Sequence, residues 1–291
     1  MLANKVYILG GAQTDFTRNW AREGLELFDM FREVVIEGLI ATGLEPEQIE
    51  VGHVGNFVAE RFCQQGLMGG FFGHVSPELR DIPTSRHEAA CASGSMAALA
   101  AMSDIQAGHY ELACVVGAEL MRNVPGKVGA EYLGAATWAG KEALDCDYPW
   151  PHMFDQLAAE YDRRYGMHYD SLKTIARINY NNAARNPFAQ SRNWTIEAGH
   201  FSDNDQLNPL IEGRMRKMDC GQITDGAACI FLASERAARV YAQGRGLSLN
   251  EIPYIKGWGH RSAPLLLTEK LRISAQQPFI FPHVRLMVED A

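Results

Sequence analysis

One cysteine stands in a context that favours nucleophilic chemistry. Cys91 begins the stretch CASGSMAALAAMSDIQ, in which small and apolar residues recur until Gly108. This pattern predicts a helix that starts at Cys91, is apolar on every side and is therefore buried, followed by a buried strand over 112–116. The unpaired N–H groups and partial positive charge at a helix N-terminus favour a reactive thiolate and stabilise an oxyanion. Most free cysteines are simply buried, but this position predicts that Cys91 is a nucleophile.

A partial metal-binding pattern precedes this cysteine. The segment HEAA over 87–90 matches the start of the zinc motif HExxH, but Cys91 replaces the second histidine. His87 is instead expected to be a loop residue that packs beside the site. The six cysteines stand singly without a CxxC pair, so neither a metal site nor a disulfide framework is predicted. Cys220 and Cys229 are expected to be structural, and reduced thiols are typical of a cytoplasmic protein.

The hydrophobic pattern also predicts the elements that position Cys91. The expected strands cover 6–9, 53–59, 112–116, 227–233 and 252–257. The expected helices cover 25–44, 91–108, 154–165, 171–184 and 234–245, and one more begins at 281. The two prolines of DYPWP predict a rigid, non-helical stretch over 147–151. The first expected strand ends at Gly10-Gly11 without a GxGxxG pattern, which excludes a dinucleotide-binding turn.

Composition and charge exclude several classes of protein. The chain has 291 residues, of which 47% are hydrophobic and 21% are charged. This is an ordinary globular balance, and the length is sufficient for one or two domains. The formal net charge of −8 argues against nucleic acid or an anionic membrane surface as a partner. We expect neither a signal peptide nor a membrane-spanning segment, because no long apolar run occurs.

The segments around Cys91 resemble those of a known family. CASG over 91–94, IQAG over 105–108 and GAELM over 117–121 resemble the nucleophile segment of thiolases. VYILGGAQTDF from Val6, NNAARNPFAQ from Asn181 and DCGQITDGAA from Asp219 are similar to other thiolase segments. The resemblance implies a layered α/β fold with a mostly parallel sheet and a buried nucleophile helix. It also implies that Cys91 takes the acyl group from an acyl-CoA.

The resemblance implies a division of the chain into three parts. Residues 1–121 and 221–250 correspond to an N-terminal thiolase domain, and 122–220 to an inserted loop domain. Residues 251–291 correspond to the start of a truncated C-terminal domain. The strands near 112–118 and 227–233 are therefore expected to lie side by side in one sheet. Within the insertion, His152 and Met153 resemble a segment that binds the substrate or CoA.

Two expected groups are missing. A complete thiolase carries a GHPxG segment, whose histidine activates the nucleophile, and a CxGGG segment, whose cysteine moves the substrate proton. Neither segment occurs in this sequence, and acyl transfer with carbon–carbon bond formation needs such bases. We therefore expect that the chain alone does not turn over acyl-CoA. Three interpretations stay open: a fragment of a longer enzyme, an enzyme completed by another chain, or a degenerate homologue that binds without catalysis.

The resemblance implies a thiolase-like acyl-CoA acyltransferase. Its reaction is acetyl transfer between acetyl-CoA molecules or thiolytic cleavage of a 3-oxoacyl-CoA, through an acyl-enzyme on Cys91. The substrate is a coenzyme A thioester, with no metal or redox cofactor, in cytoplasmic lipid metabolism. A homo-oligomer, dimer or tetramer, is implied. The alternative is a non-catalytic subunit that binds acyl-CoA or a partner chain, and a decarboxylating ketosynthase is more remote.

Overall fold

The two apolar runs on either side of the insertion pair with each other. In the computed structural model, which describes residues 4–291, β4 (Leu112–Glu119) lies antiparallel to β7 (Gly226–Ser234) from Leu112↔Ala233 to Glu119↔Gly226. The predicted adjacency of these strands is therefore confirmed. More than a hundred residues separate them along the chain, so this pairing closes the sheet around the insertion.

Five strands form the main sheet, in the order β1-β7-β4-β2-β3. The remaining three are β1 (Val6–Gln13), β2 (Val51–Gly55) and β3 (Thr84–His87). Strand β2 runs parallel to β3 and to β4, whereas β7 runs antiparallel to β4 and to β1. The sheet is thus mixed, with parallel strands on the side that carries the residues leading to Cys91.

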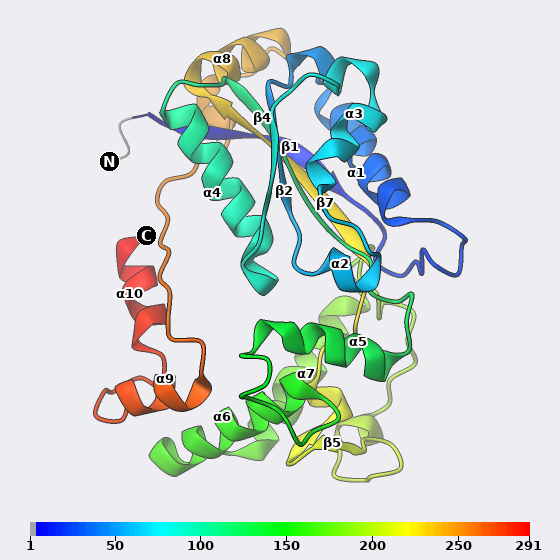
Figure 1. Cartoon of the computed structure of the whole chain (residues 1–291), viewed down its shortest axis with the longest axis vertical. Helices are drawn as coiled ribbons and strands as arrows, with labels where there is room; N and C mark the ends of the chain where they lie inside the picture. Colours follow the sequence, from blue (N-terminus) through cyan, green and yellow to red (C-terminus); the bar gives the residue numbers. More distant parts are fainter. Residues whose placement is uncertain (1–3) are drawn as a thin grey trace.

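Helices cover both faces of the sheet (Figure 1). On one face α1 (Leu27–Thr42) buries its apolar stripe, including Phe31 and Val35, against sheet residues such as Val116. Its C-terminus is closed by Gly43 in the left-handed conformation. On the same face lies α8 (Glu235–Gly244), and the short helices α2 (Ala59–Phe62) and α3 (Phe72–Val75) follow β2.

The opposite face is covered by α4 (Ser93–Gln106). Its small residues Ala97 and Ala101 bring the helix close to Ala113 and Val115 of β4, within a cluster that is buried throughout. The prediction that this helix is buried holds for that face only. Ser95 and Ser103 are exposed, and Leu99 is half-buried, because nothing in residues 4–291 covers the outer face. A helical pattern that is apolar all round identifies surface that needs covering, without identifying what covers it.

The insertion forms a group of elements below the sheet in Figure 1. These are α5 (Gly126–Leu133), α6 (Pro149–Tyr165), α7 (Tyr169–Ala183), β5 (Leu210–Glu212) and β6 (Met215–Arg216). The expected non-helical stretch over 147–151 is wrong, because α6 begins at Pro149. A proline is accepted in the first turn of a helix, where its missing N–H has no intrahelical partner. The proposed domain bounds themselves remain a prediction.

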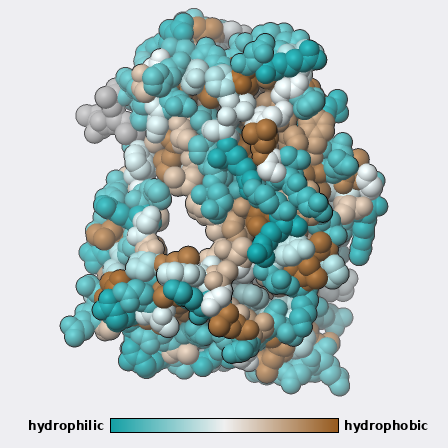
Figure 2. Space-filling model, in the orientation of Figure 1, coloured by the Kyte–Doolittle hydropathy of each residue, from teal (hydrophilic) through white to brown (hydrophobic). Residues whose placement is uncertain are grey.

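The C-terminal segment leaves the sheet early. The expected strand over 252–257 is wrong, since only an isolated bridge joins Tyr254 to Tyr7 of β1. The chain then runs extended to α9 (Leu267–Ile273) and α10 (Pro282–Asp290), the latter confirming the helix expected from 281. Figure 2 shows an opening between this segment and the rest of the molecule. Within residues 4–291, no helix combines the length and the apolar character needed to cross a membrane.

Candidate active site

Cys91 lies on a sharp turn between β3 and α4. It belongs to a single 3₁₀ turn, Ala90–Ala92, that joins directly onto the helix. Ala90 has a φ of 49°, and this left-handed conformation costs a non-glycine residue about 1–3 kcal/mol. The buried Ser93 stabilises the turn, since its hydroxyl donates to the Ala90 carbonyl at 2.7 Å and accepts from the Ala89 N–H at 2.9 Å. The turn leaves Cys91 exposed.

A glycine in β2 lets the strand touch the start of this helix. A Cβ atom on Gly55 would lie 2.5 Å from the Gly94 Cα and 2.6 Å from its nitrogen, closer than carbon atoms approach in proteins. Gly55 also pairs with Gly117 of β4 in the parallel part of the sheet. The carboxyl ends of β2 and β4 therefore meet the N-terminal end of α4, which is the edge where α/β proteins bind ligands.

A cavity of about 520 Å³ opens at this edge and includes Cys91 in its lining. Its wall includes the end of β2, the turn before α4, the end of β4, and residues 221–228 at the start of β7, together with Phe16, Leu133 and Ala136. Trp150 of α6 closes it from the insertion. The wall is mainly apolar, and the polar side chains that line it include Cys91 and Glu119.

Glu119, the last residue of β4, holds a fixed position in this wall. One carboxylate oxygen accepts the Phe57 N–H at 2.5 Å and the other accepts Asn56 Nδ2 at 2.9 Å. Burial raises the pKa of Glu119 to about 7, although the Phe57 N–H, the Arg86 guanidinium and Asn56 oppose this shift. A carboxyl group with this pKa changes its protonation state near neutral pH. The sequence analysis quoted Glu119 within GAELM without assigning it a role.

A buried carboxylate connects two walls of the cavity. Asp225 is fully buried, and its Oδ1 accepts the N–H groups of Met121 and Arg122, each at 2.8 Å. Its Oδ2 accepts the backbone N–H of Trp20 at 3.3 Å. Asp225 thus ties the segment after β4 to the segment before β7. Asp225, the aspartate of the DGAA segment, therefore has a structural role as the acceptor of three N–H groups. The sequence alone did not indicate this role.

The other cysteines are in surroundings that suppress their reactivity. Burial raises the pKa values of Cys63, Cys220 and Cys229 to about 11. Burial also raises the pKa of Cys114, which lies in the core of β4. The structural role predicted for Cys220 and Cys229 agrees with these environments.

His152 and Met153 are not brought to Cys91. Both are half-buried in the first turns of α6, and neither lines the Cys91 cavity, whereas Trp150 does. The His152 ring contacts Gln156 one turn along the same helix. Their role in substrate binding remains a prediction, and Trp150 is the residue of this segment that the sequence reasoning missed.

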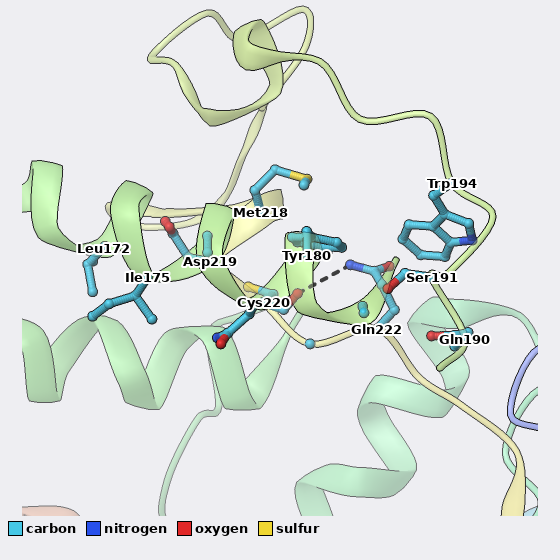
Figure 3. Close-up of a pocket in the computed structure, with 14 residues that line it drawn as sticks. Leu172, Ile175, Tyr180, Gln190, Ser191, Trp194, Met218, Asp219, Cys220 and Gln222 are labelled. Carbon is cyan, nitrogen blue, oxygen red and sulfur yellow. Dashed lines mark hydrogen bonds between the residues drawn. The ribbon is translucent and has the colours of Figure 1, made fainter. Parts of the chain in front are cut away.

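Three further pockets adjoin the cavity through its own lining residues. One of about 330 Å³ lies between α7 and residues 218–222, with Leu172 and Ile175 at one end, Tyr180 in the middle and Trp194 at the other end (Figure 3). A second, of about 580 Å³, is lined by Arg22, Arg122 and Lys217, and it shares Trp150, Gly221 and Gln222 with the Cys91 cavity. A third, of about 720 Å³, lies between α6 and α7 with mainly apolar walls.

A cluster of two histidines lies beside the site, under α4. The Nδ1 atom of the buried His53 is 3.0 Å from His87 Nε2, and the Ser85 hydroxyl lies within 3.1 Å of both nitrogen atoms. On its other side, His53 Nε2 is 3.1 Å from Asp104 Oδ2 of α4. Burial lowers the pKa of His53, the neighbouring His87 lowers it further, and Asp104 raises it. Burial also lowers the pKa of His87, which ends β3 and is not the loop residue expected.

This cluster predicts a loss of stability in mild acid. Below the ordinary histidine pKa of about 6.5, the unfolded chain binds more protons than the folded chain. The contribution of these histidines to the free energy of unfolding is therefore complete above that pH. It is lost as the pH falls through their lowered pKa values in the folded chain, by at most about 1.4 kcal/mol per pH unit for each histidine. We expect urea unfolding to show a smaller dependence on pH, between 7 and 5.5, for His53→Gln than for the unmodified chain.

The exposed His109 provides the control for this prediction, because His109→Gln is expected to keep the original pH dependence. Glu119 has the opposite effect on the pH dependence of the free energy of unfolding. Its raised pKa lets the folded chain take up a proton in this range, which stabilises the folded chain as the pH falls. That contribution is common to all three proteins and cancels in the comparison. Equal slopes for the unmodified chain and His53→Gln would contradict the prediction.

Comparison with known proteins agrees with the geometry. The family model described as "Thiolase, N-terminal domain" matches residues 6–236. The acetyl-CoA acetyltransferase of Methanothermobacter thermautotrophicus is 27% identical over 238 residues, covering 81% of this chain and 58% of the relative. That of Methanocaldococcus jannaschii is 27% identical over 274 residues, covering 93% of this chain and 64% of the relative. The chain therefore spans about three fifths of the length of these two relatives.

Solved structures share the fold. One described as an Ltp2-ChsH2(DUF35) aldolase has a TM-score of 0.64 at 20% identity, covering 95% of this chain and 69% of that chain. Human mitochondrial 3-ketoacyl-CoA thiolase in complex with CoA has a TM-score of 0.62 at 15% identity, covering 91% of this chain and 72% of that chain. The predicted α/β, thiolase-like fold is confirmed. Since the family model matches most of the sequence, the chain belongs to the thiolase family.

Proposed function

We propose that this chain is an acyl-CoA acyltransferase that forms a thioester on Cys91. The observation that carries the proposal is the exposed thiol on the strained turn before α4, inside a cavity that also holds a proton-accepting carboxyl group. The reaction is acetyl transfer between acetyl-CoA molecules or thiolysis of a 3-oxoacyl-CoA. Two relatives with the name acetyl-CoA acetyltransferase support this choice.

The adjoining pockets suit the parts of coenzyme A. The pocket with Arg22, Arg122 and Lys217 offers cations to the phosphate groups. Tyr180 and Trp194 lie in a stacked arrangement at 6.3 Å between ring centroids and offer aromatic surface to the adenine. A thiolate and a carboxyl group supply the nucleophile and the proton transfer, so the proposal includes no metal or redox cofactor.

We also propose that the chain works in an assembly. The uncovered outer face of α4 supports this, because half-buried residues such as Leu99 would be enclosed by a second copy or a partner chain. The aldolase neighbour is a complex by its description. A homodimer is one form of this proposal, and a non-catalytic subunit that binds acyl-CoA beside a partner is the alternative function. A cytoplasmic location fits the six free cysteines, and a role in lipid metabolism follows from the proposed acyl-CoA substrate.

The function is tested by trapping the acyl-enzyme. Purified chain is mixed with acetoacetyl-CoA, quenched in acid and analysed by peptide mass spectrometry. We expect one acetyl group on the peptide that contains Cys91, and none after Cys91→Ala. Cys146→Ala is the matched control, because the Cys146 thiol lies outside the cavity and bonds to the Ala143 carbonyl. Absence of acetylation, together with measurable CoA binding, would favour the non-catalytic subunit.

A further inference from the structure

The largest of the pockets described above has no part in the proposed binding of coenzyme A. It measures about 720 Å³ and lies between α6 and α7, within the range of about 300–1,000 Å³ that is typical of small-molecule sites. All of its lining residues fall between positions 150 and 221. Since the cationic pocket with Arg22, Arg122 and Lys217 suits the phosphates, and Tyr180 and Trp194 suit the adenine, this apolar pocket is available to another part of the substrate.

The walls of the apolar pocket offer large side chains that are open to solvent. Phe154 and Tyr161 of α6 are 54% and 47% exposed, and Ile175 of α7 is 54% exposed. None of the residues that line this pocket is a lysine or an arginine, so it does not suit a phosphate group. Large apolar side chains that gather at an exposed pocket are typical of a surface that binds an apolar group.

Two residues join the apolar pocket to the Cys91 cavity. Trp150 and Gly221 line both, and they also line the cationic pocket. The Trp150 indole has a fixed position, because its Nε1–H donates to the Leu133 carbonyl at 3.1 Å. Gly221 leaves the junction open, since a Cβ atom added there would meet no atom within 4 Å. The nucleophile, the cationic pocket and the apolar pocket therefore share one junction.

A 3-oxoacyl-CoA has the shape that suits this junction. Cys91 attacks the 3-oxo carbon, which is joined through C2 to the coenzyme A thioester and on its other side to the remainder of the acyl group. When coenzyme A extends into the cationic pocket, the apolar pocket receives that remainder. A volume of about 720 Å³ is far larger than the methyl group of acetoacetyl-CoA requires.

We propose that the pocket between α6 and α7 binds the acyl group of the substrate, and that this group is a long chain or a bulky apolar ring system. This rests on the proposed function. Gly221 determines specificity, because its missing side chain opens the path from the Cys91 cavity into the pocket. The chain would then differ in substrate from its two relatives, whose name, acetyl-CoA acetyltransferase, specifies an acetyl group.

The test compares two thioethers of coenzyme A that cannot acylate Cys91. S-dodecyl-CoA carries a long apolar chain and S-ethyl-CoA a short one, and isothermal titration calorimetry measures the dissociation constant of each. We expect the unmodified chain to bind S-dodecyl-CoA at least about a hundredfold more tightly, because each buried methylene contributes about fourfold. The heat capacity change should also be more negative for the longer ligand, as burial of apolar surface requires.

A side chain at the junction should remove most of this preference. Gly221→Leu adds its side chain in open space and at a position without a left-handed backbone, so it should lower the ratio of the two dissociation constants at least about tenfold. Gly244→Leu is the matched control. Gly244 ends α8, is exposed, has equally open surroundings and lines none of these pockets, so the ratio should stay unchanged.

A second variant changes the apolar pocket alone. Ala158 of α6 lines this pocket but neither the Cys91 cavity nor the cationic pocket. Ala158→Trp should therefore weaken the binding of S-dodecyl-CoA and leave that of S-ethyl-CoA unchanged.

Equal affinity of the unmodified chain for the two thioethers would overturn the proposal and leave the proposed function intact. A preference for S-dodecyl-CoA that survives both Gly221→Leu and Ala158→Trp would also overturn it, because the long chain would then bind elsewhere. Failure of the unmodified chain to bind either thioether would overturn the proposal together with the proposed function.

Discussion

Iodoacetamide is expected to modify Cys91 faster than any other cysteine of the folded chain. Alkylation requires the thiolate, and a thiol with a pKa of about 11, such as Cys63 or Cys220, is ionised to only about one part in 3,000 at pH 7.5. Cys114 and Cys229 are also enclosed in the core. Cys91 is exposed in the turn before α4, so the reagent reaches its sulfur without any opening of the fold.

Limited labelling followed by peptide mapping measures the six rates in one experiment. Cys146 is the most demanding competitor, because it is only half-buried; burial and the neighbouring Glu212 and Asp147 raise its pKa. Cys91→Ala should abolish the fast phase, and Cys146→Ala should leave it unchanged. Faster reaction of Cys146 or Cys63, with Cys91 unmodified, would contradict the assignment of the nucleophile. Labelling after denaturation in urea should make the six rates similar.

The elements near Cys91 could be predicted because each depends on residues that are close together in the sequence. The apolar run in β4 and the small residues of α4 each point to one conformation, and the structure has both. Two of the expected elements were wrong, for different reasons. The prolines at 149 and 151 were expected to prevent a helix, yet both fall in its first turn. The run over 252–257 was expected to form a strand, but β1 offers it only the single bridge at Tyr254.

The candidate site was harder to predict, because its properties arise from contacts across the chain. Cys91 was found from its position at a helix start, a pattern within a few residues. The pKa of Glu119 is raised only because the fold buries it, and its hydrogen-bond partners Asn56 and Phe57 come from more than sixty residues earlier in the chain. The signal that could have drawn attention to Glu119 was its position at the end of a buried apolar strand. Burial of α4 likewise depends on what lies outside it, which no pattern within the helix describes.

Asp225 provides the last prediction, because its carboxylate serves three N–H groups at once. Asp225→Ala removes the acceptor of Trp20, Met121 and Arg122, and each unsatisfied donor costs about 1–3 kcal/mol. We expect the free energy of unfolding, measured with urea, to fall by about 3 kcal/mol or more. Asp225→Asn keeps one oxygen acceptor in the same volume and should cost less than half as much.

Because Met121 and residues 221–224 line the Cys91 cavity, Asp225→Ala should also slow acylation of Cys91 in the protein that remains folded. Stability equal to that of the unmodified chain in both variants would show that water replaces the carboxylate, and that another contact holds these two walls together.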